Sequence, residues 1–209
     1  MQMEESNRKN EILEAAAKRF WRYGLRKTAL HEIAADVGLV KSALYKHFLD
    51  KEDLLKAVVF RELEKHHARS CWILNRSGDM RTTLKEHFVS ILGSAMEEIS
   101  ELGISAEVWR ELRPFILLCQ QERQLGDSDV LKIFFRQAAQ RGEVDCGNID
   151  DTIMLIFLWF EPVLNMCVEG TLNLNKANGL LTSMVDLLVD GLRPRNQAAG
   201  PSDKGADAI

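Results

Sequence analysis

Residues 41 to 48, KSALYKHF, bring together side chains that suit contact with nucleic acid. Lys41, Tyr45, Lys46 and His47 are basic or aromatic hydrogen-bond donors, and the segment contains no acid. Lysine can donate to guanine O6 or N7, alanine can touch a thymine methyl group, and tyrosine and histidine can donate to phosphate oxygens. This composition is typical of a helix that reads DNA.

A short helix is predicted just ahead of this segment. Apolar residues recur there at three- and four-residue steps, namely Leu30, Ile33, Ala34 and Val37. This spacing gives one apolar helix face over residues 29 to 37. Thr28 precedes the run and can cap it by accepting a backbone N–H bond. Gly38 follows the run, and glycine ends helices because it takes the left-handed conformation without a Cβ clash.

A second helix is predicted to begin two or three residues after Gly38. Leu44 and Phe48 are four residues apart and would point inward together. Two helices joined so tightly must cross at a steep angle, as in a helix-turn-helix, whose second helix enters the major groove. An ordinary helical hairpin with a solvated basic face is the alternative interpretation.

The flanking sequence extends this pattern in both directions. ILEAAAKRFWRYG comes before it, T-x-x-x-E-I-A-x-x-V-G spans the first helix, and LYKHF-x-x-KEDLL spans the second helix and the start of the next. Residues 8 to 60 thereby resemble the N-terminal domain of TetR-family repressors. The resemblance implies an all-α chain of about nine helices. An N-terminal three-helix helix-turn-helix domain would precede a C-terminal helical domain for ligand binding and dimerisation.

The resemblance also implies which residues face DNA. They are Thr28, Lys41, Ser42, Ala43, Tyr45, Lys46, His47 and Lys51, with Lys51 meeting a phosphate at the start of the following helix. Two positions depart from the family pattern, because Val40 and Ala29 stand where a Ser or Thr is usual. Each departure removes a phosphate or cap hydrogen bond, so Ser42 and the lysines are expected to provide more of the anchoring.

Composition and charge limit the class of protein. The chain has 209 residues, of which 46% are hydrophobic and 28% charged, enough for a large core in one or two domains. Residues 1 to 70 contain 14 Lys and Arg against 11 Asp and Glu, whereas the remainder contains 13 against 20. A basic head on an acidic body suits DNA contact through one end.

Targeting and redox features point to the cytoplasm. No signal peptide is recognisable, and no apolar run approaches ~18 residues, so no membrane span and no membrane partner are expected. The four cysteines, Cys71, Cys119, Cys146 and Cys167, are scattered without a CxxC pair. This spacing disfavours both a zinc site and a secreted disulfide framework. Most are expected to be buried thiols, with redox sensing by one of them left open.

The domain organisation follows from the breaks between helical patterns. Residues 1 to 50 form the predicted DNA-binding domain, beginning with a loose arm over 1 to 7 and a helix that ends at Gly24. Residues 51 to 192 form the helical ligand-binding and dimerisation domain, in which 51 to 74 is a connecting helix. Residues 193 to 209 are expected to be disordered.

Several helices are expected within the second domain. A helix from Met80 breaks around Gly103, and another over 105 to 121 is interrupted or restarted at Pro114. Asp127 or Ser128 can cap the next helix, which runs to Gln140.

Two long apolar helices, over 148 to 168 and 175 to 191, complete the predicted fold. The first carries apolar residues on more than one face, including Met154, Leu155, Leu158 and Trp159. A single apolar face would be enough to pack on its own domain. The surplus predicts a homodimer that associates through these last two helices.

A small-molecule site is implied by the resemblance more than by any single residue. Large or pliable apolar side chains are its candidate lining: Phe88, Met96, Trp109, Phe115, Phe134, Trp159 and Phe160. Polar candidates for orienting a ligand are His87, Glu107, Arg113 and Glu161. The lining favours a hydrophobic or aromatic effector.

Catalysis is disfavoured by the motifs that the sequence lacks. A di-iron carboxylate bundle needs two Glu-x-x-His motifs, and only Glu64-x-x-His67 is present. There is no G-x-S-x-G, phosphate loop or dinucleotide fingerprint, and no cofactor or metal is expected. The prediction is a repressor that binds a palindromic double-stranded DNA operator as a dimer and is released by a small effector. The alternatives are a DNA-binding regulator without an effector and, less favoured, a helical-bundle enzyme.

Overall fold

The computed structural model describes residues 2–76, 78–123 and 127–194, and this part of the chain contains nine α-helices and no strand. The first four helices are α1 (Gln2–Lys27), α2 (Leu30–Asp36), α3 (Lys41–Leu44) and α4 (Lys51–Leu74). The other five are α5 (Met80–Leu102), α6 (Ala106–Arg123), α7 (Asp127–Gln140), α8 (Ile149–Val168) and α9 (Leu174–Gly191). The all-α prediction is confirmed.

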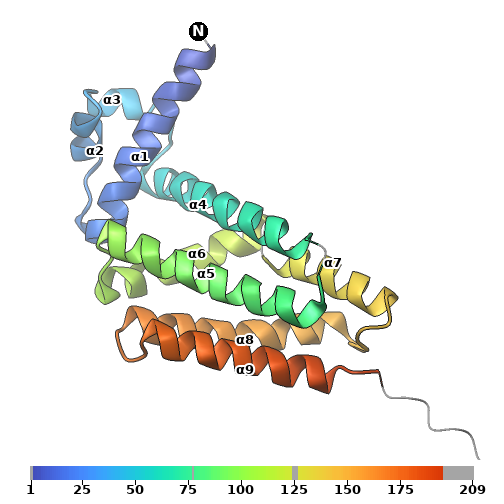
Figure 1. Ribbon diagram of the computed structural model, residues 1–209. Coiled ribbons are helices and arrows are strands. Elements are labelled where there is room, and N and C mark those ends of the chain that lie inside the picture. The colour runs from blue at the N-terminus through green and yellow to red at the C-terminus, as the bar shows by residue number, and fades with distance from the viewer. Residues whose placement is uncertain (1, 77, 124–126, 195–209) are drawn as a thin grey trace, which may run out of the picture.

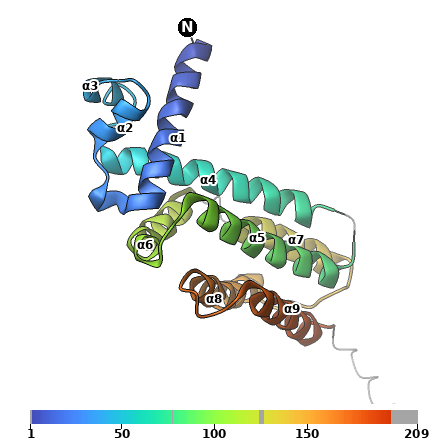
Figure 2. The same cartoon turned by 60° about the vertical axis from the view of Figure 1, so that its left-hand side comes forward.

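The helices form a small head and a larger body. Helices α2 and α3 lie beside α1 at one end of the molecule, and α4 runs from this head along the body (Figure 1). Helices α8 and α9 lie side by side on the opposite side of the body in both views (Figures 1 and 2). The head and the α8–α9 pair are therefore separated by the helices between them.

Two apolar clusters hold these parts together. One lies in the body between α5, α7, α8 and α9, with Phe135 and Leu84 fully buried. The other fills the head and includes Phe20, Ile33 and Leu44. Helix α6 belongs to the head cluster, because Leu112 on this helix packs there. The head core thus extends into the body.

Local capping sets where the helices begin. The carboxylate of Asp50 accepts the N–H of Asp53, and the carboxylate of Asp53 accepts the N–H of Leu49, so α4 begins at Lys51 as predicted. At the start of α5, α8 and α9, a side-chain oxygen of Asp79, Asn148 and Asn173, respectively, accepts one backbone N–H of the first turn. The short turn between α2 and α3 uses Gly38, whose φ of 67° is the left-handed conformation that the sequence predicted.

Three local predictions are wrong. Residues 2 to 7 are helical and extend α1 instead of forming a loose arm. Pro114 does not divide its helix, since α6 is continuous through it. Thr28 does not cap α2, because the N-cap residue is Ala29, whose methyl side chain cannot accept a hydrogen bond. The carboxylate of Glu32 instead accepts the N–H of Ala29 at 3.2 Å. The tail prediction for 195 to 209 lies outside the described residues.

Helix α8 contradicts the prediction that no apolar segment is long enough to span a membrane. Within the described residues it is the one helix long and apolar enough by length and composition, with a mean hydropathy of 1.5. Only 33% of its most apolar stretch is buried in the monomer. The core of a soluble protein contains helices of the same composition, so this helix is weak evidence for a membrane. It does present an apolar surface that its own chain leaves uncovered.

The four cysteines are free thiols. Cys119 and Cys167 are buried, as expected, whereas Cys71 and Cys146 are half-buried.

Candidate nucleic-acid interface and internal cavity

The basic segment of the head is held by two buried side chains. Leu44 and Phe48 point into the head core, as their spacing predicts. Beyond Leu44 the chain continues as turns in which His47 N–H donates to Leu44 O at 2.9 Å. Lys46 N–H donates to Ala43 O at 3.3 Å. Residues 41 to 48 therefore form one short helix followed by turns, with one face packed against the core and the other face exposed.

The structure brings most of the predicted DNA-facing residues onto that outer face. Lys41, Ser42, Tyr45 and Lys46 are exposed, while Ala43, His47 and Lys51 are half-buried. The Lys41 ammonium lies 5.6 Å from the centre of the Tyr45 ring, a cation–π contact. No acid lies among residues 41 to 48, so this face is positive.

Thr28 is the exception, because its side chain is only 2% exposed. Its hydroxyl donates to the carbonyl of Gly24 at 2.7 Å and so faces α1 instead of the exposed face. The carbonyl of Thr28 accepts a bond from Nζ of Lys51 at 3.0 Å. Thr28 and Lys51 therefore tie the end of α1 to the start of α4, a role that the sequence did not predict.

An ion pair fixes the first helix of the pair against α1. The guanidinium of Arg19 donates to both carboxylate oxygens of Asp36, at 2.5 and 2.9 Å. It also lies 3.2 Å from the carboxylate of Glu32. The hydrogen bond from Arg19 lowers the pKa of Asp36 more than the partial burial of that carboxyl raises it. These contacts set the orientation of α2, and hence of the exposed face that follows.

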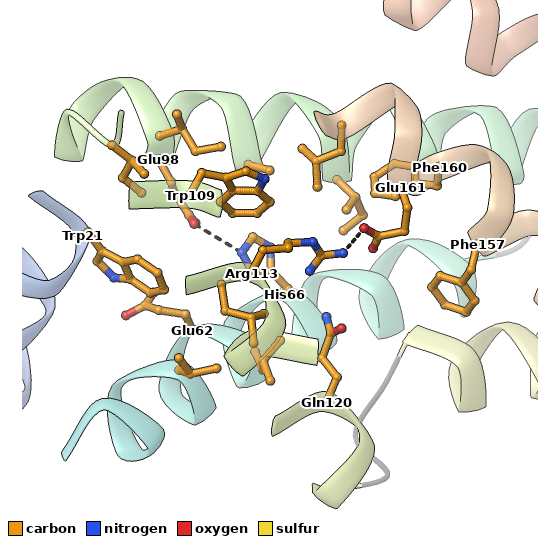
Figure 3. Close-up of a pocket in the computed structure, with 18 of the residues that line it drawn as sticks. Trp21, Glu62, His66, Glu98, Trp109, Arg113, Gln120, Phe157, Phe160 and Glu161 are labelled. Atoms are coloured by element: carbon orange, nitrogen blue, oxygen red, sulfur yellow. Dashed lines mark hydrogen bonds and ion pairs between the residues drawn. The ribbon is translucent and has the colours of Figure 1, made fainter. Parts of the chain in front are cut away.

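A cavity of about 160 Å³ lies in the body, lined by residues from six helices. Its walls are mostly apolar and aromatic, with Trp21 from α1, Trp109 from α6, and Phe157 and Phe160 from α8 around it (Figure 3). Because Trp21 also packs in the head core, the cavity touches the head directly. Concave, mostly apolar pockets with a few polar groups are typical of small-molecule sites.

The predicted lining residues separate into three groups. Phe88, Trp109 and Phe160 line this cavity. Met96 lines a second, shallower hollow with Arg69 and Leu174. The structure places the remaining three elsewhere: Phe134 in the body core, Trp159 against that core, and Phe115 against the head cluster.

The polar candidates behave differently from the apolar ones. His87, Arg113 and Glu161 line the cavity, and Arg113 and Glu161 form an ion pair inside it (Figure 3). Glu107 lies outside, exposed, with its carboxylate 3.5 Å from Nζ of Lys27.

Sequence reasoning missed most of this lining. The missed residues include Trp21, His66, Glu98, Gln120 and Phe157. His66 Nε2 lies 3.2 Å from the Glu98 carboxylate. Burial alone would raise the pKa of Glu98, but the hydrogen bond and charge of His66 lower it overall. A repeat of three and four residues along α6 (Trp109, Arg113, Ile116, Gln120) could have indicated a common helix face.

Helix α6 also contacts the end of α1 on another face. The carboxylate of Glu111 accepts the backbone N–H of Arg26 at 2.9 Å. It lies directly over Gly24, where a Cβ would be 2.5 Å from Glu111 Oε2. The same helix therefore forms a cavity wall and holds the junction between α1 and α2.

Known proteins share both the sequence pattern and the fold. Residues 12–58 match the family model described as "Bacterial regulatory proteins, tetR family". The HTH-type transcriptional repressor KstR2 of Rhodococcus jostii is 32% identical over 177 residues, covering 78% of this chain and 85% of that protein. The chain belongs to the TetR family of transcriptional regulators.

Other relatives in the TetR family extend this result. The uncharacterized HTH-type transcriptional regulator Rv0472c of Mycobacterium tuberculosis is 41% identical over 165 residues, which cover 71% of this chain. The match spans only 62% of that longer protein. A TetR-family regulator from Mesorhizobium loti has the same fold, with a TM-score of 0.72 at 20% identity, over 89% of this chain and 96% of that one.

A further structural neighbour was solved with a small molecule. It is the regulator FadR of Bacillus subtilis in complex with stearoyl-CoA, with a TM-score of 0.66 at 20% identity. The likeness covers 88% of this chain and 98% of that one and shows the fold alone. TetR-family members are regulators of transcription and not enzymes.

Proposed function

We propose that this TetR-family chain is a homodimeric repressor that binds a palindromic operator and releases it when a small apolar effector enters the cavity. The observation that carries the proposal is the exposed face of residues 41 to 48. Lys41, Ser42, Tyr45 and Lys46 project outward there while Leu44 and Phe48 anchor the segment. A convex positive unit of this size suits the major groove. The name of the KstR2 relative supports repression as the outcome.

The proposed dimer interface is the outer surface of α8 and α9. The large apolar side chains of these two helices that are exposed in the monomer include Met154, Leu155, Leu158, Met166, Leu180 and Leu187. Several exposed large apolar side chains on neighbouring helices favour an interaction site. A second copy covering the same face would bury it isologously and place two heads on one side of the assembly. A dimer of this kind would also explain the exposed apolar surface of α8 without a membrane, and this fits a cytoplasmic protein.

The proposed domain organisation is a DNA-binding head over residues 1–50 and an effector and dimer body over 51–192, in which residues 51–74 connect the two. Helix α6 is the proposed coupling element. One face of it lines the cavity, and Leu112 and Glu111 on its other faces contact the head. An effector that favours a different position of α6 would shift the population toward head geometries that fit the operator poorly.

Selection of sequences from a pool of randomised duplexes tests the proposed function. The 209-residue protein should enrich an inverted repeat whose half-sites are about 34–36 Å apart, or a multiple of that distance. Enrichment of a single unrepeated site would contradict the dimer. Failure to enrich any sequence would contradict operator binding.

A further inference from the structure

The size of the cavity limits what it can hold. Its volume is about 160 Å³. An engineered apolar cavity of ~150 Å³ in another protein binds benzene, so a volume of this order accommodates about one ring. The aromatic walls formed by Trp109, Phe157 and Phe160 suit a flat apolar molecule (Figure 3).

One strong hydrogen-bond donor in the wall of this cavity has no protein acceptor within the described part of the chain. The Arg113 side chain is 11% exposed, and it crosses the cavity between Trp109 and Gln120 (Figure 3). Its guanidinium lies 5.4 Å from the centre of a Trp109 ring, and its Nη2 donates to the carboxylate of Glu161. Its Nε is buried without a hydrogen-bond partner. A buried donor left without an acceptor is costly, so an oxygen atom placed there would be bound strongly.

The charges around Arg113 argue against a charged ligand. Among the described lining residues, the carboxylate of Glu161 already neutralises Arg113, and Glu98 is paired with His66. The third carboxylate, Glu62, pairs with Arg61 and Lys65. An anionic ligand would compete with Glu161 for the guanidinium. A cationic ligand would lie against Arg113, and either would lose its hydration on entry.

We propose that the effector is a neutral molecule about one ring in size that carries a carbonyl or similar oxygen, which accepts the Nε–H of Arg113. This inference rests on the proposed function, in which the cavity is the effector site. The apolar body of this molecule would lie against the aromatic walls. Its single polar atom would accept a hydrogen bond from Nε of Arg113, which has no hydrogen-bond partner among the described residues of the protein.

Four planar probes of nearly equal size separate the possibilities. Acetophenone carries the neutral oxygen, α-methylstyrene replaces it with carbon, benzoate is the anion and benzamidine is the cation. Calorimetric titration of the 209-residue protein should show acetophenone binding at least about ten-fold more tightly than the other three, as expected for a hydrogen bond to a charged group. Equal affinity for acetophenone and α-methylstyrene would overturn the proposal, as would tightest binding of benzoate or benzamidine, or binding of none of the four.

Variants of the ion pair test the assigned donor. The double variant Arg113→Met/Glu161→Gln removes both charges together, so that no buried carboxylate is left alone. It should bind acetophenone and α-methylstyrene equally, whereas the control Arg110→Met, at an exposed position on the same helix, should keep the preference. A preference that survives the double variant would overturn the role of Arg113.

A milder variant covers the case in which the double variant does not fold. Glu161→Gln keeps the guanidinium but removes its carboxylate partner, so it should strengthen benzoate binding about ten-fold or more. Unchanged benzoate affinity in a folded Glu161→Gln protein would contradict the competition with Glu161.

A separate measurement distinguishes failure of this inference from failure of the proposed function. Operator affinity is measured with each probe at saturation. Acetophenone that binds by way of Arg113 without weakening operator binding would support the ligand chemistry and contradict the effector role of the cavity.

Discussion

The carboxylate of Glu111 joins the cavity wall to the DNA-binding head, since it accepts the Arg26 backbone N–H at 2.9 Å. It fits there because Gly24 has no side chain. A Cβ at Gly24 would lie 2.5 Å from Glu111 Oε2, and the φ of 81° at Gly24 is a conformation that residues with a side chain rarely adopt. Any shift of α6 that separates Glu111 from Arg26 would therefore alter the end of α1 and the start of the helix-turn-helix.

The first prediction is that Glu111→Ala weakens the coupling between cavity and head. The ratio of operator affinities without and with saturating acetophenone should fall at least about three-fold, because α6 loses its direct bond to the α1–α2 junction. Typical coupling spans ~5–150-fold, so a change of this size is measurable. Acetophenone affinity itself should stay within about two-fold.

The matched control for this variant is Glu107→Ala. Glu107 is on the same helix one turn earlier and forms only an exposed, 3.5 Å pair with Lys27. Exposed pairs contribute little, about 0–1 kcal/mol. Equal loss of coupling in the two variants would contradict the special role of Glu111.

The second prediction concerns the dimer. Leu158→Glu should give monomers or insoluble protein, because it places a charge in the proposed α8–α9 interface. Leu187→Glu should do the same, since Leu187 is 74% exposed in the monomer while its neighbour Leu188 is buried.

Leu118→Glu on α6 is the control, since Leu118 and Leu158 are both 58% exposed in the monomer. Light scattering at micromolar concentration should show a dimer for Leu118→Glu and for the unchanged chain. A monomeric unchanged chain would refute the interface, and so would a dimeric Leu158→Glu variant.

The third prediction is a pH dependence of the head. Arg19 holds the pKa of Asp36 below its usual value, so the folded state favours the ionised carboxylate. The stability that this pair provides is present above the unfolded pKa, about 3.9, and is lost as pH falls through the lower folded pKa. Asp36→Asn should reduce the free energy of unfolding at neutral pH by about 1 kcal/mol or less, since the pair is partly exposed. The variant should also no longer lose the stability of this pair as the pH falls.

Thermal unfolding of both proteins between about pH 2 and pH 7 measures this effect. The difference in stability between the two proteins should shrink as the pH falls below about 4. A difference that is constant with pH would show that the carboxylate charge of Asp36 contributes nothing to the head.

Much of the head could be predicted from sequence because its signals are local. Gly38 ends α2 in a left-handed conformation, and Leu44 and Phe48 are buried, as their four-residue spacing indicates. Thr28 was misread because its hydroxyl had two partners within reach. Sequence cannot decide between capping α2 and bonding the Gly24 carbonyl, and the structure shows the second. Residues 2 to 7 carry no apolar stripe, which hid the extension of α1.

The cavity could be predicted only in part. Phe88, Trp109 and Phe160 line it, but Phe134 is an equally large residue that packs in the body core. Which aromatic ring faces open space depends on how helices cross, and no local pattern encodes that. Trp21 was missed for the same reason, since it belongs to the head helix and reaches the cavity only through tertiary packing.

Operator binding through the exposed face of residues 41 to 48 is tested most directly by binding isotherms at several salt concentrations, using the selected operator and a scrambled duplex. Lys41→Ala should lose about 1–3 kcal/mol for the operator and relax sequence preference at one position. Lys46→Ala, which removes an exposed ammonium from the same face, should weaken binding to both duplexes alike and reduce the salt slope by about one. Unchanged affinity in both variants, with the fold and the dimer intact, would contradict the placement of this face in the groove.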